Sequence, residues 1–130
     1  MRRPDALDIG TLSDPARDVT LFASVYRTTT PWERLRGLLG RAPLAPGEGL
    51  LIDPCGSIHT FLMGYPIDVV YLSRDFVVSK IVPRLGPWRC SMAFGAAMTL
   101  ELCAGAAEQT GLVTGQALLW RPGSDPAGDT

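Results

Sequence analysis

Lysine and histidine are the scarcest reactive side chains of this 130-residue chain, which has one of each, Lys80 and His59. The 12 basic residues are therefore almost all arginine, and 13 acidic residues bring the formal net charge to −1. Without a run of like charge, this composition argues against a surface that binds nucleic acid. No segment approaches the roughly 20 apolar residues of a membrane-spanning helix. We therefore expect neither nucleic acid nor membrane as a partner.

Cysteine is also sparse, and its number is odd. Cys55, Cys90 and Cys103 cannot all pair within one chain. The charged start of the sequence is not followed by the apolar segment, about 7–15 residues long, of a secretory signal. We therefore expect a cytoplasmic protein with reduced thiols. Export by another route would instead allow one disulfide and one free thiol.

The length and the hydrophobic content, 46% of residues, predict one domain with a real core. Residues 1–17 and 122–130 are rich in Asp, Pro, Arg, Gly, Ser and Thr and lack an apolar period. We expect them to be a flexible N-terminal segment and a flexible C-terminal tail. The single globular domain would then span residues 18–121.

The hydrophobic pattern predicts short strands and one main helix. β-branched and aromatic residues favour strands at 19–27, 49–53, 67–72, 76–82, 97–103 and 117–120. Ser73-Arg74-Asp75 would join two of them in a hairpin. Thr30-Pro31, followed by apolar residues at helical spacing, predicts a helix over about 31–39, and 106–110 can form only a turn or two. The fold class is therefore α+β, a compact β-rich domain with a curved, largely antiparallel sheet or open barrel.

The segment 55–68 (CGSIHTFLMGYPID) concentrates chemical variety, with Cys55, His59, Met63 and Asp68 in a short stretch. In an extended chain, alternate side chains from Cys55 to Met63 project to one face. A row that mixes apolar bulk with a few polar groups is typical of small-ligand sites. Pairing across the turn at 64–66 would place His59 opposite Tyr71.

Two sharper interpretations of this segment depend on its geometry. Cys55, His59 and Met63 are a soft-ligand set suited to copper, but on a strand they lie about 13 Å apart in pairs, too far for one ion. Cys55 and His59 could also form a nucleophile–base pair in a thiol-dependent hydrolase, if their side chains came within hydrogen-bond reach. Strand geometry favours neither, so we expect no metal site and no cofactor.

The order of motifs resembles the family known as domain of unknown function 192. The matching segments are 34–41 (RLRGLLGR), 49–52 (GLLI), 57–61 (SIHTF) with Met63, 66–72 (PIDVVYL), 87–89 (PWR), 100–102 (LEL) with Ala104-Gly105, and Gly111 with Gly115. The resemblance implies a compact, β-rich α+β domain without an established reaction or cofactor. The family often has Gly-Asp where this chain has Gly115-Gln116.

These observations lead to a binding hypothesis. We expect a small non-enzymatic binding or accessory domain, with a ligand cleft beside residues 55–63 and an unknown small molecule or protein as its partner. The candidate ligand-binding residues are His59, Met63, Asp68, Arg89, Glu101 and Cys55. Each also has a purely structural interpretation: Glu101, for example, would need an arginine partner if buried. The alternatives are the thiol-dependent enzyme and the copper-binding protein.

Overall fold

Strands make up most of the computed structural model, which describes residues 7–28, 43–60 and 64–123. The elements are β1 (Leu7–Asp14), β2 (Val19–Thr28), β3 (Glu48–Ile52), β4 (Ser57–His59), β5 (Ile67–Leu72), β6 (Val78–Leu85), β7 (Cys90–Met92), β8 (Met98–Cys103), α2 (Ala106–Gln109) and β9 (Leu119–Pro122). The helix expected at 31–39 and the candidate residue Met63 lie outside the described residues. Within the described part, no helix is both long and apolar enough to cross a membrane.

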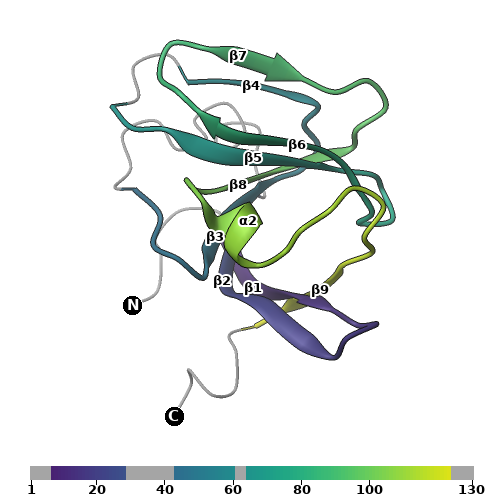
Figure 1. Ribbon diagram of the computed structural model, residues 1–130. Coiled ribbons are helices and arrows are strands. Elements are labelled where there is room, and N and C mark those ends of the chain that lie inside the picture. The colour runs from purple at the N-terminus through teal and green to yellow at the C-terminus, as the bar shows by residue number, and fades with distance from the viewer. Residues whose placement is uncertain (1–6, 29–42, 61–63, 124–130) are drawn as a thin grey trace.

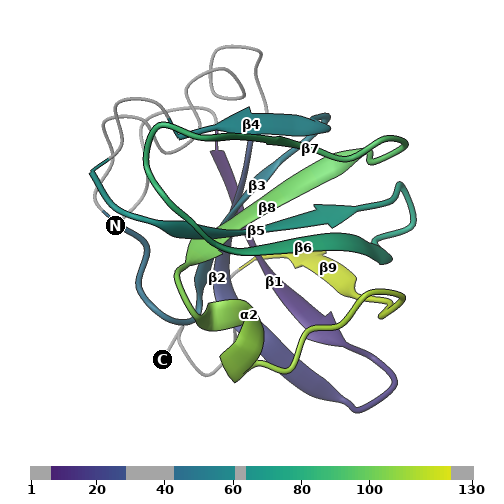
Figure 2. The same cartoon turned by 45° about the horizontal axis from the view of Figure 1, so that its top comes forward.

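Seven strands form one curved sheet in the order β6-β5-β8-β3-β2-β1-β9 (Figures 1 and 2). Neighbouring strands run antiparallel, except for the parallel pair β2–β3. The sheet is not closed, although the segment before β9 bonds to the start of β6, where Val78 N donates to Gln116 O at 2.9 Å. This arrangement confirms the predicted β-rich fold with a curved, largely antiparallel sheet.

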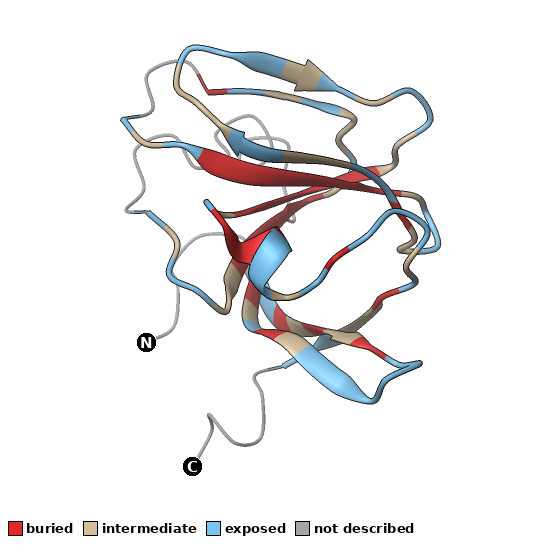
Figure 3. Ribbon diagram, in the orientation of Figure 1, coloured by how far each residue is buried: buried red, intermediate tan, exposed pale blue. Residues whose placement is uncertain are grey.

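Both faces of the central strands are covered, which explains their nearly continuous apolar sequences. Every residue of β5 is buried, and Figure 3 shows this strand red along its length. On the concave face Val70, Leu72 and Leu100 pack with Leu12 and Phe22 of the first two strands and with α2. The opposite face carries Leu50, Ile52, Ile67, Val69 and Tyr71. Strand alternation thus divides the apolar side chains between two cores.

The second core is covered by a separate two-stranded sheet of β4 and β7. Ile58 from β4 and Ala93 and Ala96 after β7 pack on it. The outward residues of the two strands are exposed, which gives both strands the same alternating burial pattern. The β4–β7 pair is therefore a thin outer layer, with one face packed on the second core and the other exposed to solvent.

The N-terminal expectation is wrong for residues 7–14, which form β1 between β2 and β9 instead of a flexible segment. Only alternate residues of such a strand need burial, so Gly10, Leu12 and Asp14 suffice and the polar residues between them hide the pattern. Gly10 marks a close approach: a Cβ there would lie 2.4 Å from a ring carbon of Trp120. The glycine serves packing across the sheet rather than a turn.

The expected pairing of His59 with Tyr71 is also wrong. β5 is hydrogen-bonded on one side to β6 and on the other to β8, so neither of its edges is available to β4. The segment 83–92, in which no strand was predicted, supplies the end of β6 and the whole of β7. His59 consequently lies opposite Cys90.

Candidate functional site

An open groove of about 830 Å³ lies where the β4–β7 pair meets the edge strand β6. We call it the Lys80 groove. Its described lining consists of Ser57, Ile58, His59, Lys80, Val82, Leu85, Cys90, Ser91 and Met92. Four aliphatic or thioether side chains supply apolar surface, and no Asp or Glu occurs among these lining residues. The groove lies beside the segment that the sequence pointed to.

Buried Thr60 holds the groove's two layers in place. Its hydroxyl donates to Gly86 O at 2.6 Å and accepts a hydrogen bond from Arg89 N at 2.9 Å. Its own backbone N donates to Arg89 O at 2.8 Å. One side chain thus fixes the turn between β6 and β7 against the end of β4. Threonine suits this role because its hydroxyl can donate and accept at once.

Lys80 is the cation of the groove, and it joins β6 to β7. Its Nζ donates to Met92 O at 2.8 Å and lies 6.0 Å from the centre of the Tyr71 ring. An ammonium group has three donors, so the bond to Met92 leaves capacity for a ligand. The only lysine and the only histidine of the chain therefore line the same groove. Sequence reasoning missed Lys80, although its being the single lysine was visible.

The structure does not bring Cys55 and His59 together as a nucleophile–base pair. The Cys55 thiol donates to Ser57 O at 2.8 Å, and the residue packs with Ile58 on the inward side. His59 lies exposed on the outward side of β4. Within the part of the chain that the structure describes, the Cys55 thiol and the His59 ring thus lie on different sides of the β4 segment.

Asp68 belongs to the fold and not to the groove, contrary to the expectation that it lines the cleft. It is fully buried, on the face of β5 that α2 covers. Its Oδ1 accepts a hydrogen bond from Arg84 N at 2.8 Å, and its Oδ2 accepts one from Ala107 N at 2.9 Å. A carboxylate there joins the end of β6 to the first turn of α2.

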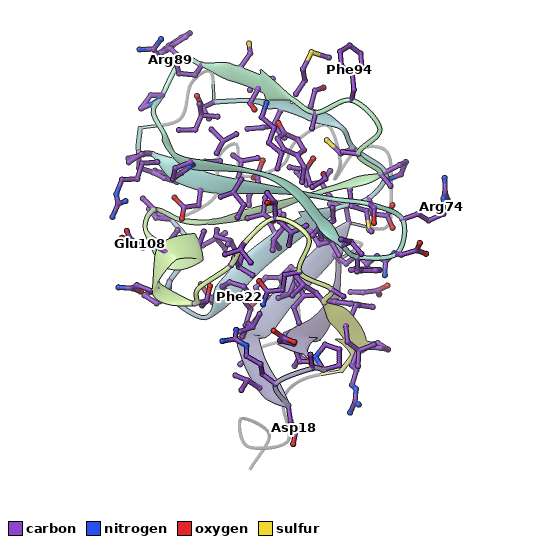
Figure 4. All side chains as sticks on the ribbon, turned by 45° about the vertical axis from the view of Figure 1, so that its right-hand side comes forward. Asp18, Phe22, Arg74, Arg89, Phe94 and Glu108 are labelled. Atoms are coloured by element: carbon purple, nitrogen blue, oxygen red, sulfur yellow. The ribbon has the colours of Figure 1, made fainter. Side chains whose placement is uncertain are left out.

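Glu101 and Arg89 also lie away from a common cleft. Glu101 is 3% exposed in the centre of β8, opposite Val69, and so lies beneath the outer layer. Arg89 is exposed, and Figure 4 shows it at the outer margin, pointing away from the ribbon. The expected convergence of these residues on His59 is therefore not found.

Two tyrosines near Glu101 are held in the neutral form. Burial raises the pKa of Tyr71, the charges of Cys55 and Glu101 raise it further, and the Ser91 hydroxyl opposes the rise. Burial likewise raises the pKa of Tyr65, with a contribution from Glu101. Since a free phenol already titrates near pKa 10, a further rise keeps both phenols protonated, and neither serves as a base near neutral pH.

A second cavity, of about 510 Å³, lies near the ends of β2 and β3 and is built around a satisfied arginine. Arg27 pairs with Asp53. Its guanidinium lies 5.7 Å from the Phe76 ring and 5.5 Å from the Trp120 ring. These contacts tie four parts of the chain together, so Arg27 has a structural role that accounts for its position.

Comparisons with known proteins concern the fold more than the groove. A family model designated DUF192 and described as "Uncharacterized ACR" matches residues 15–120. A protein of unknown function from Novosphingobium aromaticivorans superposes with a TM-score of 0.76 at 20% identity, covering 92% of this chain and 91% of that one. A protein from Sinorhizobium meliloti, described as a candidate transcription regulator, has the same TM-score at 23% identity, with 92% and 98% covered. No curated protein matches the chain. At these identities the solved structures show a shared fold.

Proposed function

Since the chain belongs to the uncharacterised family DUF192, we propose a function from the groove itself: a non-enzymatic binding domain for a small amphipathic molecule with an anionic group. The observation that carries this proposal is the composition of the Lys80 groove. Apolar side chains supply most of its surface, and the one formal charge among the lining residues that the structure describes is positive. Such a combination favours an apolar ligand body with a carboxylate or similar head.

The charge of the groove defines the ligand's polarity. Lys80 Nζ can donate to an anion while it keeps its bond to Met92 O. Ser57, Ser91 and His59 add polar groups along the lining. A cationic ligand would find no carboxylate among the described lining residues to neutralise it. The chain's net charge of −1 does not favour a nucleic acid as the anion.

The apolar part of the groove supplies the affinity. Ile58, Val82 and Leu85 are partly exposed and face a common space. Removal of such surface from water is worth about 25 cal/mol per Å². A medium-length alkyl chain would cover these residues and leave its head near Lys80. We therefore expect weak binding driven by apolar contact and oriented by charge.

Decanoate and decyltrimethylammonium provide a direct test, because they share an alkyl chain and differ in the sign of the head. We expect decanoate, below its micelle concentration, to shift the ring signals of His59 and to slow acetylation of Lys80. Both reporters are unambiguous, because each residue is the only one of its kind. Equal effects of the two amphiphiles, or no protection of Lys80 by decanoate, would refute the proposal.

Variants of Lys80 distinguish recognition of the anionic head by Lys80 from nonspecific binding of the amphiphile. Lys80→Gln removes one charge-assisted hydrogen bond and should weaken decanoate binding about tenfold or more. Lys80→Arg keeps the charge and should retain most of the affinity. Arg121→Gln removes an exposed cation outside the groove and serves as the matched control. If Arg121→Gln weakens binding as much as Lys80→Gln, the head group does not recognise Lys80.

A further inference from the structure

The outward face of the β4–β7 pair carries an unusual set of soft side chains. Ser57 and His59 of β4 are exposed, as are Cys90 and Met92 of β7. Met92 is 55% exposed, so its thioether is accessible from solvent. Thiol, imidazole and thioether therefore share one wet surface. The Cys55–His59–Met63 set considered from the sequence has a different cysteine and a different methionine.

The hydrogen-bond pattern places these side chains close together. Thr60 N donates to Arg89 O at 2.8 Å, and Ala93 N donates to Gly56 O at 3.0 Å. Hydrogen-bonded and non-hydrogen-bonded pairs alternate along an antiparallel ribbon. The two bonds mark Thr60–Arg89 and Gly56–Ala93 as hydrogen-bonded pairs. The pairs His59–Cys90 and Ser57–Met92 each lie next to one of them in the register, so both are non-hydrogen-bonded pairs. In that kind the facing side chains are nearest, with Cβ atoms about 4.5–5.5 Å apart.

The third ligand comes from the diagonal neighbour. Met92 lies two residues beyond Cys90 on the same face of β7. Diagonal cross-strand neighbours are about 7–8 Å apart, within reach of a long, flexible side chain. Counting only His, Cys, Asp and Glu, the described residues contain no cluster of three ligands. The thioether of Met92 completes the set.

From this juxtaposition we infer that the outward face of β4–β7 binds a soft monovalent metal ion, Cu(I), through Cys90 Sγ, one ring nitrogen of His59 and Met92 Sδ. Thiolate and thioether ligands select Cu(I), and imidazole suits copper as well. The thiol loses its proton on binding, so one proton is released per ion. The second ring nitrogen of His59 remains able to keep a hydrogen bond to protein, as metal-bound histidines usually do.

The composition of the site favours Cu(I) over zinc. Structural zinc sites are closed by four Cys or His ligands, whereas only two of the three ligands here are of those types. The site also lies at the surface: Phe94, the second residue after Met92, is 96% exposed, and Figure 4 shows it at the outer edge. An ion bound there can be taken up or given up without opening the core. This inference does not depend on the amphiphile proposal.

Anaerobic titration of the reduced full chain with Cu(I), in competition with bicinchoninate, tests the site. We expect one ion per chain, loss of binding in Cys90→Ser and a weakening of about tenfold or more in Met92→Leu. Both residues are exposed, so these variants should fold. Cys103→Ser and Met98→Leu alter partly or fully buried residues of the same types and should keep the wild-type affinity.

A second measurement tests whether His59 is one of the ligands of the metal. Ag(I), a diamagnetic substitute, should shift the ring signals of His59 with a stoichiometry of one, and Cys90→Ser should abolish the shift. Binding that survives in Cys90→Ser, or that Cys103→Ser reduces equally, would overturn the inference. Because Cys90 and Met92 also line the Lys80 groove, the two ideas are separated by their readouts: the Cu(I) titration contains no amphiphile, and the protection of Lys80 by decanoate is measured without metal. Failure of either idea is therefore distinguishable from failure of the other.

Discussion

The strongest prediction concerns Asp68, because a buried carboxylate with two backbone donors has no replacement of equal chemistry. In Asp68→Asn the amide nitrogen must face one of two N–H groups, Arg84 N or Ala107 N. One hydrogen bond to a charged group, worth about 1.5–3 kcal/mol, is lost, and a buried donor is left unsatisfied at about 1–3 kcal/mol. Small shifts of the surrounding atoms recover part of the two losses, so we expect the free energy of unfolding to fall by about 3 kcal/mol.

Urea unfolding followed by tryptophan fluorescence measures this loss. With a typical slope of about 2 kcal/mol per molar urea, the midpoint of Asp68→Asn should fall by roughly 1.5 M. Asp75→Asn, an exposed change in the β5–β6 turn, is the matched control and should stay within about 0.5 kcal/mol. A loss below about 1 kcal/mol in Asp68→Asn would refute the structural role. Retained decanoate binding in the folded fraction would separate Asp68 from the groove.

Three further predictions follow from other buried contacts. Gln116 Nε2 donates to Asp14 Oδ2 at 2.7 Å, and this hydrogen bond is the main cause of the lowered pKa of Asp14. Because a lowered pKa means that folding favours the ionised carboxylate, wild-type stability should fall as the pH drops below about 4. Gln116→Glu should instead unfold at a lower temperature at neutral pH, and acid should reduce the difference from wild type, because protonation removes the repulsion. Burial and the Asp68 charge raise the pKa of Cys103, so iodoacetamide should alkylate exposed Cys90 about tenfold faster or more, as peptide mass spectrometry can show. Thr60→Val should cost about 2–3 kcal/mol in urea unfolding, whereas Thr60→Ser should cost less.

Each of these has an outcome that contradicts it. If the unfolding temperatures of wild type and Gln116→Glu fall equally in acid, the hydrogen bond from Gln116 is not the cause of the lowered Asp14 pKa. Equal alkylation of the two cysteines would mean that Cys103 is more accessible than its environment indicates. If Thr60→Ser is as unstable as Thr60→Val, the methyl group and not the hydroxyl holds the turn.

The family pattern has a structural explanation at several positions that looked functional. Thr60 in the motif SIHTF fixes the turn between β6 and β7, and Asp68 in PIDVVYL joins β6 to α2. Gln116, close to the last glycine of the pattern, binds the β1–β2 turn through Asp14. Polar residues that occur within apolar motifs can therefore serve the backbone, whose buried groups need partners.

Strand positions were predictable because the relevant signal is local. The segments 67–72 and 97–103 are strands almost to the residue, since β-branched and apolar runs bounded by turn residues allow little else. The predicted 73–75 hairpin is confirmed by the β5–β6 pairing. The strand β1 at residues 7–14 was not predicted, because only its alternate residues are buried and the polar residues between them interrupt the apolar pattern.

Local patterns along the chain were enough to predict a β-rich domain of one family and to direct attention to the residues around His59. Which side chains lie beside His59 depends instead on how the strands pair. Asp68 and Glu101 went to opposite faces of the main sheet, while Lys80 and Cys90 came to His59 from β6 and β7. The reason is that strand propensity depends on neighbours along the chain, whereas pairing depends on which strand edges are already occupied. With both edges of β5 taken, β4 paired with β7, and that choice created the groove and the Cys90–His59–Met92 face.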